Sequence, residues 1–265
     1  MSRFRPSLVR EVPQEPFPTK NLLLSALGAD DLALLAPSLK RVRLHREQQL
    51  IGPGERIDEV HFLEGGVGSV TAGGGETQTE IGVIGSEGMT GVPLLLGSDR
   101  SLHKTFMQID GGTALTLGAA PLADAMRRSE SLRAHLLRYA HCYMIQLASG
   151  SVANARYRME ARLARWLLMC HDRMPDDDIP LTHEFMSLMI AAQRSGVTIT
   201  LHVLEGAGMI RSTRGLVTIL DRAKLEELAE ETYGESESEY RRLIAPFGKP
   251  AGGHAEHARE AQAAN

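Results

Sequence analysis

Cysteine is scarce in this sequence, since only Cys142 and Cys170 occur among 265 residues. Two thiols are too few for a disulfide framework or for a four-cysteine iron–sulfur site. Each cysteine has a histidine neighbour, but adjacent residues on a helix point in divergent directions and chelate a metal poorly. We therefore expect no metal and no cofactor.

Long apolar runs are also absent. The longest runs, such as Val92–Leu96, fall far short of the roughly 20 residues that a membrane-spanning helix needs. The arginines at positions 3, 5 and 10 are not followed by the apolar segment of a secretion signal. A hydrophobic content of 43% and a charged content of 23% are typical of a folded globular chain. These features predict a cytoplasmic protein without a membrane partner.

The chain has no overall excess of positive charge, because its formal net charge is −4. A contact with nucleic acid must therefore depend on where the charges lie. Five arginines fall within residues 156–173, and four more follow up to residue 222. Seven glutamates between residues 226 and 239 then reverse the sign. The stretch before these glutamates is the one that could contact an acidic partner.

Two short helices and a hairpin are predicted between Leu181 and Arg222. Thr182 is a good N-cap for the first helix, and Gly206 and Gly208 end the second. The apolar residues at helical spacing are Phe185, Met186, Met189 and Ile190, followed by Val197, Leu201 and Leu204. Short strands at Met209–Ile210 and Leu216–Ile219 then flank a turn at Ser212–Gly215. This order is typical of a winged helix-turn-helix, whose second helix enters the major groove of DNA.

A helix pair before a hairpin also occurs in purely structural cores, so the pattern by itself leaves both roles open. The segment resembles the DNA-binding end of Crp/Fnr transcription regulators. The resemblance is carried by a spaced run of residues, which are Leu204, Gly208, Ile210, Gly215, Val217, Ile219 and Asp221. It extends over roughly residues 21–243 and implies binding to double-stranded DNA.

Glycine is concentrated in one part of the chain, since 16 of the 26 glycines lie between Gly52 and Gly118. Closely spaced turns between short strands indicate a β-barrel or sandwich over residues 41–117. A short helical hairpin is expected before it, over residues 21–39. Ile51–Glu55, followed by Val60, Phe62 and Gly66, resembles the opening of the family's cyclic-nucleotide-binding β-roll.

The family's phosphate cassette is not matched in this chain. Val92 and Pro93 stand where the glutamate for the ribose belongs, and residues 101–108 contain no arginine for the cyclic phosphate. A buried phosphate needs a bidentate donor, and a lysine is not an equivalent replacement. We expect a degenerate pocket that binds neither cyclic AMP nor cyclic GMP. The residues that could line it, for an unknown small-molecule effector, are Glu87, Gly88, Gly91, Val92, His103, Lys104 and Thr105.

A helical pattern over residues 131–153 carries apolar residues at alternating spacings of four and three. This spacing is typical of a coiled-coil seam. It predicts a homodimer through Leu132, Leu136, Tyr139 and Tyr143, with Leu137, Ala140, Met144 and Leu147 facing the β-roll. A core helix internal to one chain would give the same pattern.

On the second helix of the helix-turn-helix, the inward position of Val197, Leu201 and Leu204 turns the opposite face toward DNA. The residues expected to contact bases are Arg194, Ser195, Thr198, Ile199 and His202. The resemblance places Arg194 where the family commonly has a base-contacting arginine, whereas Ser195 and Ile199 replace the family's glutamate and second arginine. Phosphate contacts are expected from Thr182, His183, Gln193 and Arg214.

These patterns and the resemblance predict an α+β chain with five parts. They are a flexible arm (1–20), an N-terminal double-stranded, cyclic-nucleotide-binding-like β-roll sensor (21–126), a long dimerisation helix (127–155), a C-terminal winged helix-turn-helix (156–243) and a disordered tail (244–265). Tyr233 and Tyr240 are expected to pack on the wing. The resemblance implies a homodimeric transcription regulator with no enzymatic activity, and RNA polymerase is a candidate protein partner.

Two other classes of protein stay open. A cupin-like enzyme would need clustered histidine and carboxylate ligands, for which His61 and His103 are too sparse. A small-molecule or second-messenger sensor without sequence-specific DNA binding would not need the arginine-bearing wing.

Overall fold

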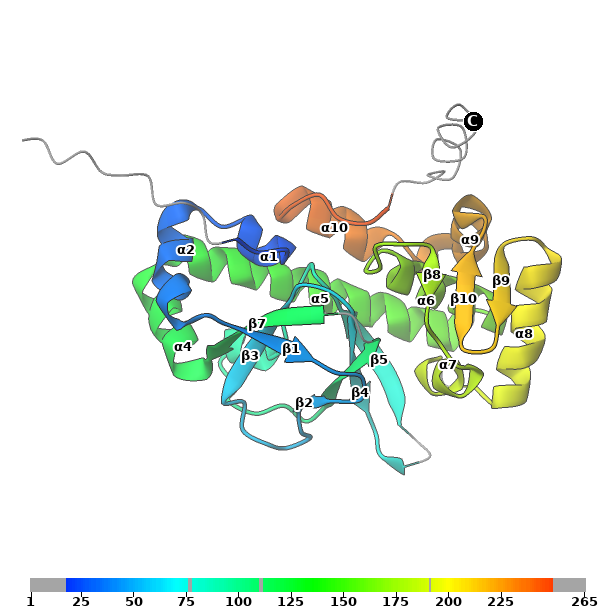
Figure 1. Ribbon diagram of the computed structural model, residues 1–265, viewed down its shortest axis with the longest axis horizontal. Coiled ribbons are helices and arrows are strands. Elements are labelled where there is room, and N and C mark those ends of the chain that lie inside the picture. Colours follow the sequence, from blue (N-terminus) through cyan, green and yellow to red (C-terminus); the bar gives the residue numbers. More distant parts are fainter. Residues whose placement is uncertain (1–17, 76–77, 110–111, 191, 250–265) are drawn as a thin grey trace, which may run out of the picture.

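The computed structural model describes residues 18–75, 78–109, 112–190 and 192–249, in which a β-roll, a long helix and a C-terminal domain follow one another (Figure 1). This is the α+β architecture that the sequence predicts. No helix within these ranges is long and apolar enough to cross a membrane.

The described part of the chain begins with a short helical hairpin that packs against the β-roll. It consists of α1 (Leu22–Ser25), α2 (Ala29–Leu35) and the 3₁₀ helix η1 (Ala36–Ser38). Asn21 caps α1, and its buried side-chain amide donates to the carbonyl oxygens of Leu63 and Gly88, both at 2.8 Å. The hairpin is thus fixed to the roll by hydrogen bonds as well as by its leucines.

Seven antiparallel strands form the two sheets of the roll. In chain order they are β1 (Lys40–Leu44), β2 (Gln49–Ile51), β3 (Glu59–Leu63), β4 (Val67–Ala72), β5 (Thr79–Ile84), β6 (Lys104–Ile109) and β7 (Gly112–Gly118). One sheet has the order β1-β7-β3 and the other β2-β6-β4-β5. The short helix α3 (Val92–Leu95) leaves the roll after Gly91, whose φ of +77° suits glycine and whose added Cβ would lie 2.7 Å from Val60.

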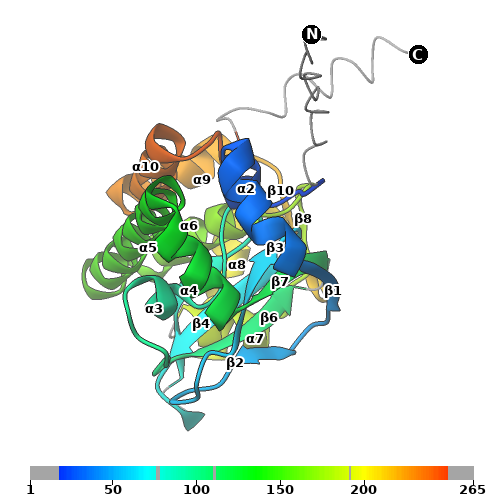
Figure 2. The same ribbon diagram turned by 90° about the vertical axis from the view of Figure 1, so that its left-hand side faces the viewer.

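Helices α4 (Ala119–Arg128) and α5 (Glu130–Arg156) lie along one side of the roll (Figure 2). Ser129 caps α5 by accepting a hydrogen bond from the backbone of Leu132 at 3.1 Å. The helix approaches β5 so closely that a Cβ on Gly82 would lie 2.6 Å from the hydroxyl of Tyr143.

The buried face of α5 corrects the predicted dimer seam. Leu132, Leu136, Tyr139 and Tyr143 are only 0, 0, 3 and 8% exposed, and all four belong to the core of the roll within one chain. The hydroxyl of Tyr139 even donates to the carbonyl of Met89 at 3.1 Å. Leu137 and Met144, which were expected to face the roll, are 39 and 56% exposed. The spacing of the apolar residues correctly identified the buried face of α5, but this face is covered by the roll of the same chain and not by a second chain.

The C-terminal domain is built on α6 (Met159–His171). The elements that follow are β8 (Asp178–Ile179), α7 (His183–Met189), α8 (Arg194–Gly206), β9 (Ile210–Thr213), β10 (Leu216–Ile219), α9 (Arg222–Ala229), η3 (Glu230–Thr232) and α10 (Glu235–Leu243). Strands β8, β10 and β9 form a three-stranded sheet in that order. The core of this domain is continuous with Val67, Val83 and Phe106 of the roll, so the two domains share a buried interface.

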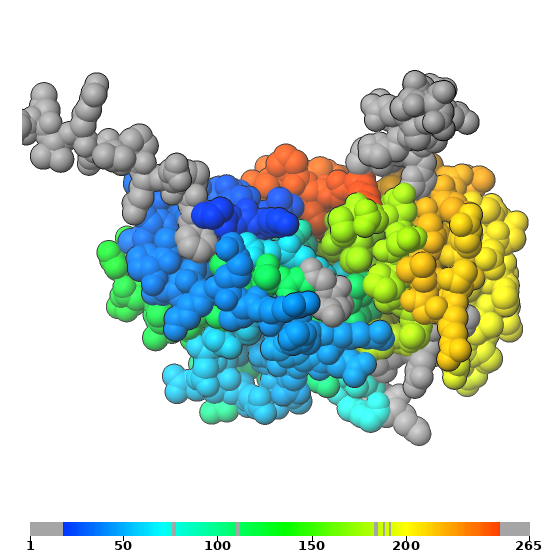
Figure 3. All heavy atoms as spheres, in the orientation of Figure 1, coloured from blue at the N-terminus to red at the C-terminus, as the bar shows by residue number. Residues whose placement is uncertain are grey.

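Residues 235–243, expected within the winged helix-turn-helix domain, form α10, and the structure also describes residues 244–249 of the expected disordered tail. Helix α10 packs against α5, and with the residues after it lies between the N-terminal helices and the C-terminal domain (Figure 3). Tyr240 packs there and not on the wing, because its hydroxyl donates to the carbonyl of Glu87 at 2.7 Å. Phe247 is buried beside it, with ring centroids 5.2 Å apart. The expected arm up to residue 17 and tail from residue 250 lie outside the described residues.

The position of Leu136 generates a prediction about stability. Leu136→Ala should lower the free energy of unfolding by about 2–5 kcal/mol, because it opens a cavity in the core of a single chain. Denaturant unfolding at a fixed protein concentration measures this change. Leu102→Ala is the matched control, because Leu102 is 82% exposed. If Leu136→Ala dissociated an oligomer without lowering the free energy of unfolding, the predicted dimer interface through Leu136 would be supported instead.

Candidate nucleic-acid interface and sensor cavity

Helix α8 turns one apolar face inward and a second, more polar face outward. Val197, Thr200, Leu201 and Leu204 are buried against the rest of the domain. The predicted base-contacting residues Arg194, Ser195, Ile199 and His202 are exposed, and Thr198 is half-buried with its hydroxyl donating to the carbonyl of Arg194 at 3.1 Å. All five therefore lie on one side of the helix, away from its core.

Helix α7 positions the start of α8. The Thr182 hydroxyl accepts a hydrogen bond from the backbone of Phe185 at 3.2 Å, as expected of an N-cap. Gln193 is exposed at the N-cap position of α8. The side chain of His183 lies outside what the structure describes, so its predicted phosphate contact has no geometry here.

The wing is tighter than the sequence suggested. Strand β9 continues through Thr213, which pairs with Leu216, so the loop holds only Arg214 and Gly215. Gly215 has a φ of +78°, in the left-handed region that favours glycine. The predicted turn at Ser212–Gly215 is corrected accordingly. Glu205 of α8 accepts the backbone hydrogen of Ser212 at 3.0 Å and so holds the wing against the helix.

Two exposed residues on this surface were not predicted as site residues. Val203 is 49% exposed one helical turn after Ile199, which is 65% exposed. Arg211 is exposed on β9. Helical spacing from Ile199 could have identified Val203. The alternation of buried and exposed positions along β9 could have identified Arg211.

The arginines of the basic stretch divide into two groups. Among the residues that the structure describes, Arg194, Arg211 and Arg214 form no ion pair with a carboxylate. Their charge is therefore available to phosphates. Arg173 and Arg222, in contrast, are buried and paired, and do not belong to the basic surface.

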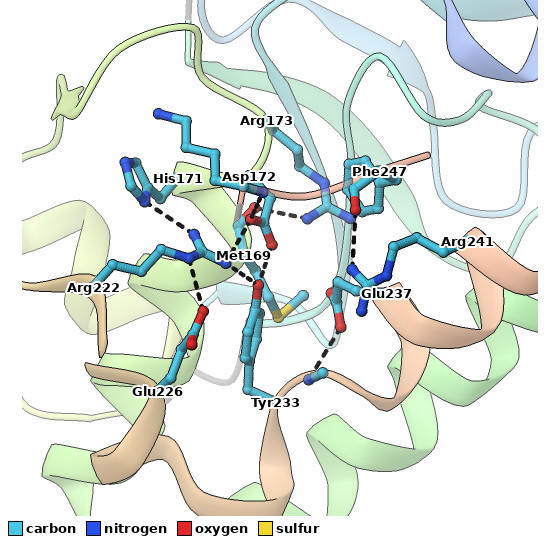
Figure 4. A network of polar contacts seen from close by, with 12 residues as sticks. Met169, His171, Asp172, Arg173, Arg222, Glu226, Tyr233, Glu237, Arg241 and Phe247 are labelled. Atoms are coloured by element: carbon cyan, nitrogen blue, oxygen red, sulfur yellow. Dashed lines mark hydrogen bonds and ion pairs between the residues drawn. The ribbon is translucent and has the colours of Figure 1, made fainter. Parts of the chain in front are cut away.

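The buried group forms a polar network at the end of α6 (Figure 4). Arg222 donates to Asp172 and Glu226, both at 2.8 Å, and to His171 Nδ1 at 3.0 Å. Because arginine only donates, Nδ1 accepts and Nε2 donates to Asp177 at 2.8 Å. Burial lowers the pKa of His171 to about 4, so the ring is neutral near pH 7.

Glu87, a predicted pocket residue, belongs to this buried region. Its carboxylate accepts from Arg173 Nη2 at 2.7 Å and from Nε at 3.0 Å. Burial opposes the charge of Arg173, but Glu87, Glu237 and Asp172 together raise its pKa above the ordinary value. The pair joins the roll to the C-terminal domain, and Glu87 is not among the described residues that line the cavity between the roll and α5.

A cavity of about 170 Å³ lies between the roll and α5. Of the predicted pocket residues, it contains Gly91, Val92, His103 and Thr105, together with Ser101, Tyr143, Met144 and Leu147. Lys104 turns away over the ring of Phe106, and Gly88 packs against Tyr139. None of the described residues that line the cavity is an arginine or a carboxylate. Within the described residues, the buried hydroxyl of Tyr143 has no hydrogen-bond partner.

Comparison with known proteins agrees with the geometry of the C-terminal domain. A family model described as a Crp-like helix-turn-helix domain matches residues 161–228. A Crp/Fnr-family protein from Eubacterium rectale is 18% identical, with a TM-score of 0.58 over 82% of this chain and 99% of that chain. A CRP-family transcriptional regulator from Thermus thermophilus is 23% identical, with a TM-score of 0.57 over 72% of this chain and 96% of that chain. FixK2 from Bradyrhizobium japonicum is 12% identical, with a TM-score of 0.59 over 72% of this chain and 98% of that chain.

A curated sequence match has a different character. Histidine–tRNA ligase from Porphyromonas gingivalis is 34% identical over 91 residues, which are 31% of this chain and 20% of that protein. The chain thus spans about a fifth of the length of that relative. Its activity is not assigned to this chain, whose fold is that of Crp/Fnr transcription regulators.

The cavity generates a prediction about ligands. Cyclic AMP and cyclic GMP should give no binding at micromolar concentration, because no described guanidinium reaches the cavity for the phosphate and Glu87 is paired with Arg173. Calorimetric titration of the full chain measures this directly. Tight binding of either nucleotide would contradict this interpretation of the cassette.

Proposed function

We propose that the chain is a DNA-binding transcription regulator that binds a palindromic site as a homodimer, because a Crp-like helix-turn-helix model matches residues 161–228. A sensor module without DNA function is the less favoured class. The observation that carries the proposal is the position of Arg194 on the outer face of α8, with the exposed Arg214 at the tip of the neighbouring wing. In a winged helix-turn-helix these places lie at the base edges and at the DNA backbone.

The outer face of α8 supports a mixed mode of base recognition. A bidentate contact to guanine O6 and N7 is the natural pairing of Arg194. Ile199 and Val203 are exposed apolar side chains one turn apart on the same helix, and side chains of this kind can contact the methyl group of thymine. Thr182, Gln193 and Arg214 would hold phosphates, which position the protein without specifying sequence.

Exposed apolar residues on α5 support the homodimer. Leu137, Met144 and Val152 are 39, 56 and 52% exposed. They are spaced about two helical turns apart, so they share one face of α5, opposite the face that is buried against the roll. We propose that this face, and not the predicted seam, packs against α5 of a second copy. Two α8 helices related by a two-fold axis would then read half-sites about 34 Å apart.

The cavity supports a small, largely uncharged effector. Its wall is mainly apolar, and Ser101, His103, Thr105 and Tyr143 supply the polar groups. Met144 lines this cavity and also belongs to the proposed dimer face. An effector could therefore change the relation between the two subunits and so favour the dimer geometry that fits DNA.

The roles of helix and wing can be separated by two substitutions. Arg194→Ala should cost about 1–3 kcal/mol of specific binding and relax the preference at one base pair. Arg214→Ala should weaken binding to all sequences alike and lower the salt slope by about one. Selection of bound fragments from random DNA gives the site, and salt titrations of wild type and variants give both quantities. If Arg194→Ala weakened specific and random DNA equally while Arg214→Ala changed the preferred base, the roles would be exchanged.

The dimer face has its own test. Met144→Asp should dissociate the dimer, because it places like charges opposite one another across the two-fold axis. DNA affinity should fall with it, because bivalent binding is lost. Light scattering measures the mass, and Leu102→Asp is the control at an exposed leucine that is not on α5. A Met144→Asp protein that stays dimeric would show that another surface makes the contact.

A further inference from the structure

A second cavity, of about 240 Å³, lies where the roll, α5 and the C-terminal domain meet. Thr79–Gly82 of β5 form one side and residues 147–154 of α5 another, while α6 and the end of α7 complete it. The described residues that line it include none of those expected to contact DNA. Ile81 and Leu147 separate it from the first cavity, because they line both. We call this second cavity the interdomain cleft.

Two arginines of α6, Arg162 and Arg165, enter the interdomain cleft without a carboxylate partner among the described residues. Arg162 donates from Nε to the side-chain oxygen of Asn154 at 3.0 Å and from Nη2 to the carbonyl of Ile190. Arg165 donates from Nε to the carbonyl of Thr232 at 2.8 Å and from Nη2 to the carbonyl of Gln146 at 3.1 Å. Within the part of the chain that the structure describes, the Nη1 group of neither arginine forms a hydrogen bond or an ion pair.

Arg162 and Arg165 are half-buried, and their contacts differ from those of the buried arginines of this chain. Arg173 and Arg222 each contact at least one carboxylate at 2.8 Å or less. Burial lowers the pKa of both Arg162 and Arg165, while the nearby Glu237 and Glu80, which within the described residues form no ion pair with Arg165, partly oppose this shift at Arg165. A charge that is partly removed from water is stabilised by a partner of opposite sign, so the cleft has room and charge for an anion.

The carboxyl group that lines the cleft does not fill this role. Glu80 accepts hydrogen bonds from Trp166 Nε1 at 2.6 Å and from the Ser69 hydroxyl at 2.5 Å, and in the described structure it makes no ion pair with either arginine. Burial raises the pKa of Glu80 to about 7, so its negative charge is weakened near neutral pH. The cleft therefore keeps a net positive charge.

We propose that the interdomain cleft binds a small organic acid, with its carboxylate on the Nη1 groups of Arg162 and Arg165 and its apolar part against Ile81, Leu147 and Met189. Guanidinium groups bind carboxylates through strong, charge-assisted hydrogen bonds. The three apolar side chains supply a surface that inorganic anions cannot use. The binding site does not depend on the chain's action on DNA, whereas its regulatory effect rests on that proposed function.

Binding in this place would connect the two domains. The arginines belong to α6 of the C-terminal domain, whereas Ile81 belongs to the roll and Leu147 to α5. A ligand that contacts all of them binds only the arrangement that keeps them together, and so raises the population of that arrangement.

The chain carries its own reporter for this site, because its one tryptophan, Trp166, lines the cleft. The fluorescence of the full chain is recorded during titration with sodium butyrate, with sodium chloride keeping the ionic strength constant. n-Butanol is the neutral isostere, and inorganic phosphate tests an anion without an apolar part. We expect a saturable change with butyrate, and no saturable change with n-butanol or phosphate.

Three variants assign the change to the arginines. Arg162→Gln should weaken butyrate binding about tenfold or more, because it removes a charged donor. Asn154→Asp keeps the side-chain shape and places a carboxylate beside Arg162, so it should compete with the ligand and weaken binding to a similar extent even if Arg162→Gln folds poorly. Arg158→Gln changes an exposed arginine next to α6 and should bind butyrate as the wild type does.

Several results would overturn the proposal. They are a butyrate titration that does not saturate, an equal response to n-butanol or phosphate, an Asn154→Asp protein that binds butyrate normally, and an equal loss in Arg158→Gln. Because no DNA is present, these outcomes are independent of whether the chain binds a palindromic site.

Discussion

Arg173 carries a charge that is almost completely removed from water, and much of the molecule is arranged around it. It stands just after α6, donates twice to Glu87 of the roll, and donates from Nη1 to the carbonyl of Met169 at 2.7 Å. Phe247 covers the guanidinium, whose carbon lies 5.2 Å from the ring centroid. An uncompensated charge in this place would cost several kcal/mol. The orientation of the C-terminal domain on the roll is therefore tied to one pair of side chains.

This pair also bears on why the roll lacks the features of a nucleotide-binding one. Glu87 stands in the stretch that aligns with the phosphate cassette, but its carboxylate is used to hold Arg173, and the Tyr240 hydroxyl binds its backbone carbonyl. The cavity is left with neutral groups and with Tyr143 and Met144 of α5. Since α5 lines the cavity and leads directly into α6, it is the element that connects the cavity to the C-terminal domain.

The sequence predicted the helices and strands better than it predicted what each of them packs against. The helix-turn-helix could be read from the Thr182 cap, the inward positions of α8 and Gly215, because each of these is a local requirement. The face of α5 could be read as buried, but its spacing does not tell whether the roll or a second chain covers it. Helix α10 escaped prediction because Glu235–Leu243 is mainly polar, and Tyr240 is its one buried aromatic residue. Its position depends on the hydrogen bond to Glu87, which is 153 residues away in the sequence.

The arginines show why charge counts alone mislead. A run of nine arginines from residue 156 to residue 222 suggested one basic surface, yet the fold gives its members three different environments. Five of them remain exposed, namely Arg156, Arg158, Arg194, Arg211 and Arg214. Arg173 and Arg222 are neutralised by carboxylates, and Arg162 and Arg165 are bound by neutral oxygens within the described structure. Exposed charges attract phosphates, and paired charges fix the domains, so neither group calls for a further ligand. Only the third group leaves positive charge in a cavity, and it does so at the junction where a bound anion would act on both domains.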